Sequence, residues 1–378
     1  MATVYLDCNA TTPLEPEVRE VLLHYLTEDF GNEGSRTHEY GTRAKQAVQK
    51  ARDQIASVLS AKRDEVIFTS GATESNNLAI LGLRLTGAEQ SKRHIITTSI
   101  EHKAILEPIE VLERDGFSVT KLPVGESGVV SPDSLKNALR PDTLLVSIMQ
   151  ANNETGVRQP LETITEVLKG HPAYFHTDAA QGFGKDMDQL KNQRIDLISI
   201  SGHKIYAPKG IGALITRRRG YDRPPIKPLC YGGGQERGLR PGTLPVALIA
   251  ALGAAAEIAE RDYDKRHDVC RLIRDKAFKA LMPLKPRLIG EQSLVMDHVL
   301  NISFSGLDSE ALIVALKDLI SISNGSACTS SSYTPSHVLK AMGMSDDEAN
   351  ACVRISWCHM TPEVDWEGIA MRINHLLH

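Results

Sequence analysis

The stretch Ser199-Ile200-Ser201-Gly202-His203-Lys204-Ile205-Tyr206 carries the main argument about the fold. It closes a run from Ile195 in which apolar and small residues alternate up to a Ser-Gly turn. This pattern predicts a buried strand that ends near the glycine, with His203 and Lys204 just beyond it. A lysine at a strand end contributes little to packing. It is well suited to hold an aldehyde cofactor as a Schiff base.

Similar strand patterns occur before and after this stretch, and helical patterns separate many of them. Predicted helices include 16–26, an amphipathic segment over 40–59, a helix that starts near Thr73, and an alanine-rich helix over 244–260. Strands that alternate with helices are typical of a mostly parallel sheet covered on both faces. We therefore predict an α/β fold with a seven-stranded sheet, whose strands are 66–69, 95–98, 118–122, 144–148, 174–178, 195–200 and 212–216.

The length of 378 residues favours two domains. The composition changes after the alanine-rich helix, and the rest of the chain has an α+β pattern with strands at 299–303 and 352–356. Helices are expected at 309–319, at 336–342 and at the end of the chain. We expect a large α/β domain over 15–257. A smaller α+β domain is expected to combine 1–14 with 258–378.

Charge and hydropathy exclude several classes of function. The formal net charge is −4, so no global positive field attracts nucleic acid or an anionic membrane. The only basic run, Arg217-Arg218-Arg219, is interpreted as a solvated strand end. No apolar run approaches the length of a membrane span, and the first residues lack the pattern of a secretory leader. A cytoplasmic location is expected.

Polar residues follow several of the predicted strands. Ligands bind in this type of sheet outside the carboxyl ends of the strands. Each polar group alone could be a helix cap, a turn or a structural histidine. Together they favour a ligand site made of Gly71-Ala72-Thr73, His102, Asn153, Asp178 with Gln181, and Ser201-His203-Lys204.

These side chains match the needs of pyridoxal 5'-phosphate. Its phosphate requires N–H groups at a helix N-terminus and nearby hydroxyls, and its ring nitrogen requires a carboxylate. Its 3-oxygen requires a donor, its ring a flat partner and its aldehyde a lysine. A substrate carboxylate requires an arginine. The candidates for the phosphate are Ala72 and Thr73 with Ser201. Asp178 is the candidate for the ring nitrogen, Gln181 for the 3-oxygen, His102 for the ring and Lys204 for the aldehyde. Arg354 with Asn153 is the candidate for the substrate carboxylate.

Cys328 is the second reactive feature of the sequence. It lies among small polar residues over 323–332, a setting that suits a thiol that travels better than a buried structural one. The other cysteines fit strands or helices and are interpreted as reduced structural thiols, of which Cys8 is the least settled. None of the six lies at zinc-ligand spacing, so no metal site is expected; the other five are Cys8, Cys230, Cys270, Cys352 and Cys358.

Nearly the whole chain resembles the cysteine desulfurases, pyridoxal phosphate enzymes of the aminotransferase class V type. The cysteine motif is similar to that of the NifS/IscS-like group. The residues that carry the resemblance are Asp7 with Ala10-Thr11-Thr12-Pro13, Phe68-Thr69-Ser70-Gly71-Ala72-Thr73-Glu74-Ser75, Thr98-Ser99 with Glu101-His102-Lys103, Asn152-Asn153-Glu154, Ser201-Gly202-His203-Lys204-Ile205-Tyr206, Gly232-Gly233-Gly234, Gly242-Thr243 and Gly325-Ser326-Ala327-Cys328.

The resemblance implies a fold-type I enzyme that converts L-cysteine to L-alanine and leaves a persulfide on Cys328 for a protein sulfur acceptor. It implies that Lys204 carries the cofactor and moves protons, that His102 stacks on the ring, and that Asp178 and Gln181 hold the ring nitrogen and 3-oxygen. The remaining implied roles are phosphate binding by Thr73, Ser201 and His203, carboxylate binding by Arg354 and Asn153, and a contact from Thr243 to the cofactor of a second subunit, hence a homodimer.

Three departures separate the chain from the housekeeping members. Asp7-Cys8-Asn9 and Ser356-Trp357-Cys358-His359 differ from the usual residues, and the sequence stops at His378 without the extension that docks an iron–sulfur scaffold. The pattern is most similar to DndA, the bacterial desulfurase that serves DNA phosphorothioation. Iron–sulfur cluster assembly stays open as a second destination for the sulfur.

Other functions remain possible from the sequence alone. A selenocysteine lyase or an aminotransferase on the same scaffold would need no mobile thiol. A non-catalytic module could keep the fold and recruit a partner, although the intact Lys204, Asp178, His102 and Cys328 argue against it. Direct binding of nucleic acid has only the run Arg217–Arg219 in its favour.

Overall fold

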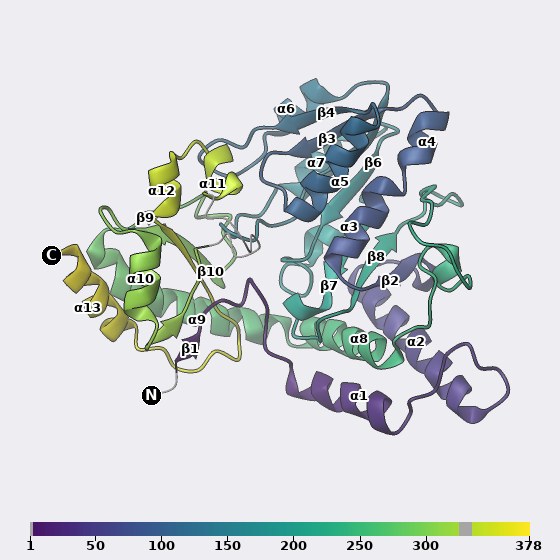
Figure 1. The fold of residues 1–378 in the computed structure, drawn as a ribbon, viewed down its shortest axis with the longest axis horizontal. Coiled ribbons are helices and arrows are strands. Elements are labelled where there is room, and N and C mark those ends of the chain that lie inside the picture. Colours follow the sequence, from purple (N-terminus) through teal and green to yellow (C-terminus); the bar gives the residue numbers. More distant parts are fainter. Residues whose placement is uncertain (1–2, 325–334) are drawn as a thin grey trace.

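The computed structural model describes residues 3–324 and 335–378. A seven-stranded sheet forms the centre of the larger part (Figure 1). Strand β8 runs antiparallel to β2 and β7, and the pairs from β7 to β4 are parallel. In spatial order the strands are β2 (Val66–Thr69), β8 (Gly212–Thr216), β7 (Leu197–Ser201), β6 (Tyr174–Asp178), β5 (Thr143–Ser147), β3 (His94–Thr98) and β4 (Ser118–Leu122).

Helices cover both faces of this sheet. Alternate residues of each strand point to opposite faces, so Ile67 and Leu197 belong to one apolar core, whereas Phe68 and Ile198 belong to the other. The first core is closed by α3 (Ala72–Leu81) and α5 (Lys103–Arg114), and α4 (Arg84–Glu89) adjoins it where Gly87 lies close to Leu144 and Phe117. The second core is closed by α1 (Pro16–Thr27), α2 (Glu39–Val58), α6 (Pro132–Ala138), α7 (Leu161–Val167) and α8 (Val246–Arg261). The predicted α/β class is confirmed.

The smaller part is built on a separate apolar core. An antiparallel sheet has the order β12 (Cys352–Ser356), β10 (Val299–Ser303), β9 (Arg287–Leu288), and the N-terminal β1 (Val4–Tyr5) pairs in parallel with β11 (Ile320–Ser321). Leu6 is buried in this core, so the first residues of the chain pack with its last third. The helices here are α9 (Tyr263–Leu281), α10 (Ser309–Leu316), α11 (His337–Ala341), α12 (Asp346–Asn350) and α13 (Trp366–Leu377).

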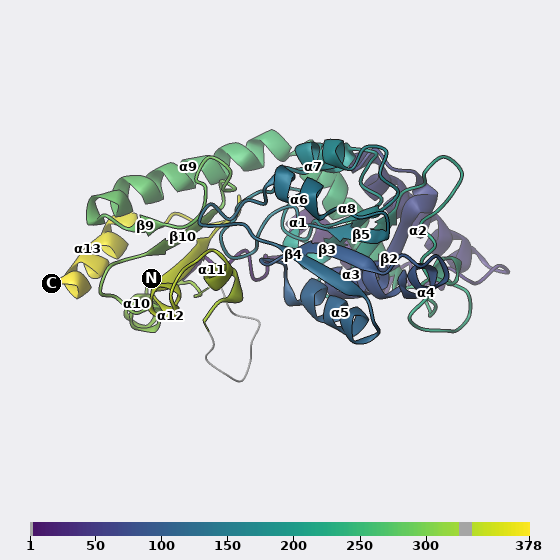
Figure 2. The same ribbon diagram turned by 90° about the horizontal axis from the view of Figure 1, so that it is seen from above.

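Helices α8 and α9 connect the two parts, separated only by Asp262 (Figure 2). The sequence analysis predicted α8 but did not predict α9. Its buried side chains, Arg266, Cys270, Ala277 and Leu281, are spaced by four, seven and four residues, and charged residues fill most other positions. Because Arg266 occupies one of these buried positions, the sequence of α9 shows no clear apolar periodicity. The boundaries expected after residues 14 and 257 stay a prediction.

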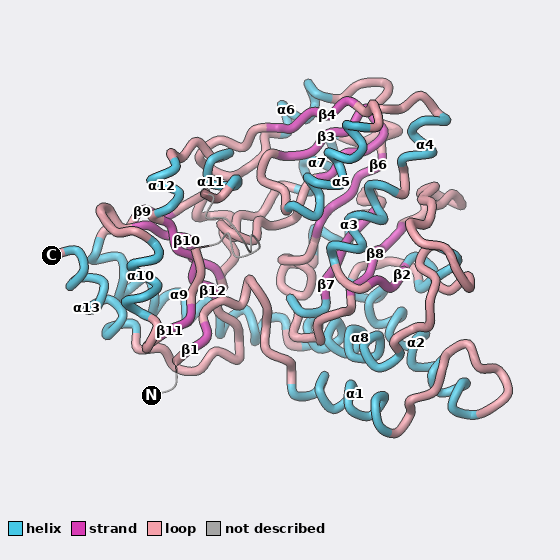
Figure 3. Tube along the Cα trace, in the orientation of Figure 1, coloured by secondary structure: helices cyan, strands magenta, loops and turns pink. Residues whose placement is uncertain are grey.

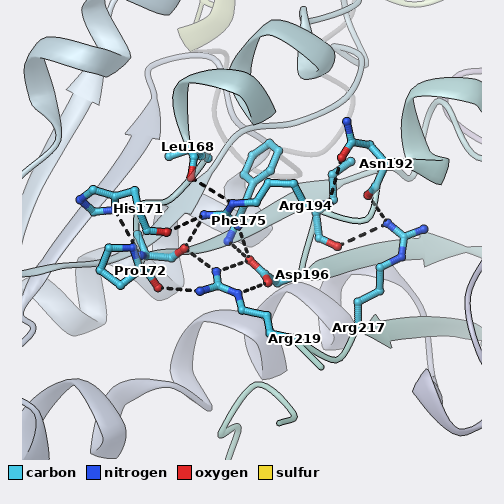
Figure 4. A network of polar contacts seen from close by, with 11 residues as sticks. Leu168, His171, Pro172, Phe175, Asn192, Arg194, Asp196, Arg217 and Arg219 are labelled. Carbon is cyan, nitrogen blue, oxygen red and sulfur yellow. Dashed lines mark hydrogen bonds and ion pairs between the residues drawn. The ribbon is translucent and has the colours of Figure 1, made fainter. Parts of the chain in front are cut away.

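The interpretation of the run Arg217–Arg219 as a solvated strand end is wrong for Arg217, whereas Arg218 is half-buried and Arg219 is exposed. Arg217 is only 1% exposed, and its guanidinium donates to carbonyl oxygens of Asn192 and Leu190 at 2.7 Å each. Arg219 pairs with the carboxylate of Asp196, to which Arg194 also donates (Figure 4). These arginines tie the ends of β7 and β8 to neighbouring loops. Arg217 is therefore buried, and the exposed Arg219 is paired with Asp196, which removes most of the support for direct nucleic-acid binding.

Candidate active site

Most predicted site residues in the larger part lie at the carboxyl ends of parallel strands. Asp178 ends β6, Ser201 ends β7, and Lys204 closes the short 3-10 turn Gly202–Lys204 that follows it. His102 follows β3 and Asn153 follows β5. The segment that joins β1 to α1 passes between the smaller sheets and the large sheet (Figure 3). The site therefore has walls from both parts of the molecule.

Asn9, on that segment, connects several predicted site residues. The Nζ of Lys204 donates to the carbonyl oxygen of Asn9 and, at 2.9 Å, to that of Ala10. The Nε2 of Gln181 donates to the same Asn9 oxygen at 3.1 Å. The Asn9 amide N–H donates to Oγ of Ser356 at 2.9 Å. The sequence analysis did not identify this role, because a backbone carbonyl carries no residue-specific signal.

Asp178 is held by donors on both carboxylate oxygens. Nδ2 of Asn76 donates to Oδ2 at 2.7 Å, and the Ala180 N–H donates to Oδ1 at 2.9 Å. Both Asp178 and Asn76 are buried. Hydrogen bonds to a carboxylate favour its charged form, which is the form that a ring nitrogen needs beside it. Asn76 was missed, and a polar pair at Ser75-Asn76 inside a helix that covers the sheet was the available signal.

The N-terminus of α3 forms a candidate phosphate cradle. Gly71 precedes Ala72 and Thr73 with φ 154° and caps the helix without a side-chain hydrogen bond, so the first N–H groups of the helix lack a side-chain cap. A Cβ on Gly71 would lie 3.8 Å from Oγ of Ser201, so this turn and the end of β7 adjoin. The structure thus brings Ala72, Thr73 and Ser201 together.

His203 and His102 are positioned by their ring nitrogens. Nδ1 of His203 lies 3.2 Å from Oγ1 of Thr11, and burial lowers the His203 pKa to about 4, so this ring is neutral near pH 7. Nδ1 of His102 accepts the Ala104 N–H at 3.0 Å and caps α5. In the neutral ring of His102 the proton is therefore on Nε2.

Arg354 on β12 is fixed by groups distant in sequence. Its Nη1 donates to the Asn153 carbonyl at 2.8 Å, and its Nη2 donates to Oδ1 of Asp7 at 2.6 Å and to Oγ of Ser323 at 3.0 Å. Nδ2 of Asn9 also donates to the Asn153 carbonyl, at 3.1 Å. The backbone of Asn153 thus orients Arg354. Arg354 is 2% exposed, and the carboxylate of Asp7 balances the charge of its guanidinium.

The site fits pyridoxal 5'-phosphate, because several of its buried polar atoms have no hydrogen-bond partner within the protein. Among the described residues, Oε1 of Gln181, Oδ1 of Asn9 and Nε of Arg354 are buried and make no hydrogen bond. Unpaired polar atoms of this kind are costly unless a ligand satisfies them. The uncapped α3 N-terminus is a place for a phosphate, and the Asp178 carboxylate is a place for a protonated ring nitrogen.

Two predicted site residues stand apart. Thr243 is exposed ahead of α8 and takes part in none of the contacts above. Cys328 lies outside the described residues. The expectation that the other cysteines occupy strands or helices is wrong for three of them, since only Cys270 and Cys352 do so. Cys230 is exposed in a loop, and Cys8 and Cys358 are buried just after β1 and β12.

Within residues 3–324 and 335–378, no group of three or more His, Cys, Asp or Glu side chains is arranged to hold a metal ion. A membrane-spanning helix is likewise not found in that part of the chain.

Comparison with known proteins gives the class. The model of the aminotransferase class-V family matches residues 4–367, and the chain belongs to this family, whose members depend on pyridoxal phosphate. Cysteine desulfurase IscS of Rickettsia bellii is 46% identical over 99% of this chain and 92% of its own. A NifS-like protein has a TM-score of 0.91 at 36% identity and covers 100% of this chain and 99% of its own. DndA of Streptomyces lividans has a TM-score of 0.83 at 50% identity over 94% and 99%.

These relatives confirm the resemblance to the cysteine desulfurases, the predicted fold and the predicted cofactor.

Proposed function

We propose that this protein is a cysteine desulfurase. The net reaction converts L-cysteine and an enzyme thiol to L-alanine and an enzyme persulfide. The observation that carries the proposal is the convergence of Lys204 and Gln181 on the Asn9 carbonyl, beside an Arg354 that shares the Asn153 carbonyl with the Asn9 side chain. The relatives named above support the same activity, and ordinary aminotransfer would leave the thiol motif at Cys328 unexplained.

Different polar groups are proposed to bind the substrate carboxylate and the cofactor phosphate. Arg354 offers a guanidinium to the substrate carboxylate and is oriented by Asp7 and Asn153. Ala72, Thr73, Ser201 and His203 would hold the phosphate of the cofactor. Bound pyridoxal phosphate would supply an aldehyde for amines and an electron sink.

Proton transfer falls to two other side chains. The amine of Lys204 takes the proton from the substrate Cα, and the Asn9 and Ala10 carbonyls keep that amine near the strand end. The Nε2–H of His102 is directed by the cap that its Nδ1 makes at α5, which suits donation to a polar substrate atom.

Cys328 is proposed as the sulfur acceptor within the enzyme. Its thiolate attacks the sulfur of the substrate, the substrate bond from Cβ to sulfur breaks, and an S–S bond forms on Cys328. The former Cβ takes a proton and becomes the methyl group of alanine. Only a thiol can complete this step without an added oxidant.

The test uses the cofactor-loaded protein with L-cysteine and measures alanine together with the mass of the peptide that contains Cys328. One added sulfur atom on that peptide, and no alanine from Cys328→Ala, is the expected result. Cys230→Ala, which alters an exposed thiol, is the matched control and should behave as wild type. Alanine at the wild-type rate from Cys328→Ala would favour a lyase that needs no enzyme thiol, such as a selenocysteine lyase, whereas a keto acid in place of alanine would favour an aminotransferase. Protein that shows no borohydride-sensitive chromophore would favour a non-catalytic module.

DNA phosphorothioation is the destination that we propose for the sulfur, with iron–sulfur assembly as the second candidate. The observation in favour is the 50% identity to DndA. Deletion of the gene should abolish phosphorothioate linkages in genomic DNA, measured by mass spectrometry of nuclease digests. Unchanged linkages together with reduced iron–sulfur enzyme activity would favour the second candidate.

A homodimer in the cytoplasm completes the proposal. A Cβ on Gly232 would lie 3.1 Å from Pro241, so the loop that carries Leu229 and Tyr231 runs beside the loop that carries Thr243. Tyr231 is 85% exposed and Leu229 is 41% exposed. Such apolar exposure suits contact with a second copy, in which Thr243 would approach the other subunit's phosphate. The compartment is tested by fractionation, because some relatives are named as mitochondrial.

A further inference from the structure

Two cysteines separated by 350 residues meet beside the active site. Cys8 follows β1 and Cys358 follows β12, and both side chains share a small buried cluster with Tyr206. The Cys8 N–H donates to the Ser356 carbonyl at 3.0 Å, which fixes the two segments against each other. Both side chains also line the same cavity. Their shared cluster places the two thiols close to each other in the interior.

The surroundings make the two thiols unequal. The adjoining Cys8 thiol lowers the pKa of Cys358 to about 7, and Oγ1 of Thr361 donates to the Cys358 sulfur at 3.8 Å. Burial and the neighbouring sulfur raise the pKa of Cys8. The ammonium group of buried Lys185 also favours a thiolate here. Cys358 is thus the nucleophile of the pair and Cys8 the thiol that holds the proton.

A cavity leads to this pair from the surface. Its volume is about 420 Å³, and its walls include Cys8, Cys358, Tyr5 and Met360. The lining is largely apolar and side chains of Lys or Arg do not contribute to it, so a small neutral reagent is favoured over a charged one. Hydrogen peroxide is a reagent of this class.

We propose that Cys8 and Cys358 are a reversible oxidation site that a small neutral peroxide converts to a disulfide. The Cys358 thiolate attacks one peroxide oxygen, the O–O bond breaks, and the other oxygen leaves as hydroxide. The Cys8 thiol then attacks the sulfenic sulfur, an S–S bond forms, and the hydroxyl leaves as water after protonation. In sum, two thiols and one peroxide give one disulfide and two waters.

Oxidation of Cys8 and Cys358 would affect the cofactor site through two neighbouring residues of the chain. Asn9 follows Cys8 directly, and its carbonyl accepts the bonds from Lys204 and Gln181. Tyr206, which packs on both thiols, lies two residues after Lys204 and has a positive φ of 68°, which is rare for a side chain of this size. Bringing the two sulfurs to bonding distance shifts the segment that carries Asn9.

The test uses full-length protein with Cys328→Ala and Cys230→Ala, so that only buried thiols remain. Samples treated with hydrogen peroxide are alkylated under denaturing conditions, digested without reduction and analysed by mass spectrometry. We expect a peptide pair linked through Cys8 and Cys358 that a thiol reductant separates. Cys270 and Cys352 are the matched buried controls and should be fully alkylated.

Two further variants keep the test independent of folding. Adding Cys8→Ala should leave Cys358 to accumulate a sulfenic acid that dimedone traps, and adding Cys358→Ala should leave Cys8 reduced. Circular dichroism checks that each variant is folded. Full alkylation of both Cys8 and Cys358, at a peroxide dose that oxidises Cys230 in the parent protein, would overturn the proposal, as would a linkage to Cys270.

The effect of the disulfide on the active site is measured by cofactor binding rather than by activity. The affinity of the oxidised protein for pyridoxal phosphate, measured by fluorescence titration, should fall about tenfold and return on reduction. An unchanged affinity in fully cross-linked protein would overturn the connection through Asn9.

Discussion

At the scale of single residues, Asp178 depends on a neighbour that the sequence did not single out. Asn76 donates to Oδ2 of Asp178 at 2.7 Å in a buried setting, where a hydrogen bond to a charged group contributes about 1.5–3 kcal/mol. The two donors, Asn76 and the Ala180 N–H, hold the carboxylate of Asp178 in a fixed orientation.

We therefore predict that Asn76→Ala lowers the affinity for pyridoxal phosphate about 10- to 100-fold, because Asp178 loses one of its donors. Titration of the cofactor absorbance measures this. Asn77→Ala is the control, since Asn77 instead donates to the Thr73 carbonyl at 2.9 Å at an exposed position. Equal losses in the two variants would contradict the specific role of Asn76.

His102 combines two functions in one ring. Its Nδ1 caps α5 by accepting the Ala104 N–H, and the ring is also proposed to act at the substrate. A cap of this kind contributes about 1 kcal/mol. The two functions can therefore be separated by the choice of substitution.

For His102→Ala we expect loss of both desulfurase activity and about 1 kcal/mol of unfolding free energy, because cap and ring are both removed. For His102→Asn we expect loss of activity with near wild-type stability, since asparagine is a strong N-cap residue. Denaturant unfolding and alanine release measure the two effects. Substantial activity in His102→Asn would argue that the ring serves only as a cap.

At the scale of elements, three neighbouring parallel strands share a buried polar bridge. His176 on β6 has Nδ1 2.9 Å from Oγ of Ser147 on β5 and Nε2 2.9 Å from Oγ of Ser199 on β7. Burial lowers the His176 pKa to about 4, although the nearby Asp178 acts in the opposite direction. The bridge therefore requires the neutral ring.

The stability of the protein should fall as pH drops from about 6.5 to about 4. In this window His176 is protonated in the unfolded chain but neutral in the folded one, so the unfolded state binds more protons. Each such histidine contributes a slope of up to about 1.4 kcal/mol per pH unit. We predict that His176→Gln reduces the slope by up to that amount, measured by urea unfolding at several pH values. Identical slopes would mean that protonation of His176 does not oppose folding.

At the scale of the whole molecule, the active site joins the two ends of the chain. Residues 4–12 pair with β11, contact β12 through Ser356 and reach Lys204 through Asn9. Arg354 is balanced by Asp7 across 347 positions of sequence. The site therefore forms only when the smaller and larger parts are both folded and in contact.

Assembly of two copies is the prediction at this scale. Tyr231→Glu places a charge at a residue that is 85% exposed in one chain, so it should leave the monomer fold intact and weaken the proposed dimer. Sedimentation velocity should show a shift toward monomer. If Thr243 reaches the phosphate in the second subunit, the affinity for pyridoxal phosphate should fall as well. Tyr221→Glu, at a residue that is 95% exposed, tests whether the effect is local. A dimer of unchanged stability in Tyr231→Glu would exclude this face.

The sequence by itself determined the strand order along the chain, the positions of Lys204 and Asp178 at strand ends, and the cofactor, because these follow from local periodicity and residue chemistry. It did not reveal Asn9, Asn76 or α9, nor the engagement of Arg217. Those depend on backbone carbonyls, on a polar residue in a helix and on charges paired across the fold. Only the tertiary structure decided that Cys8 and Cys358 are neighbours, because a contact across 350 positions leaves no trace in the local sequence of either segment.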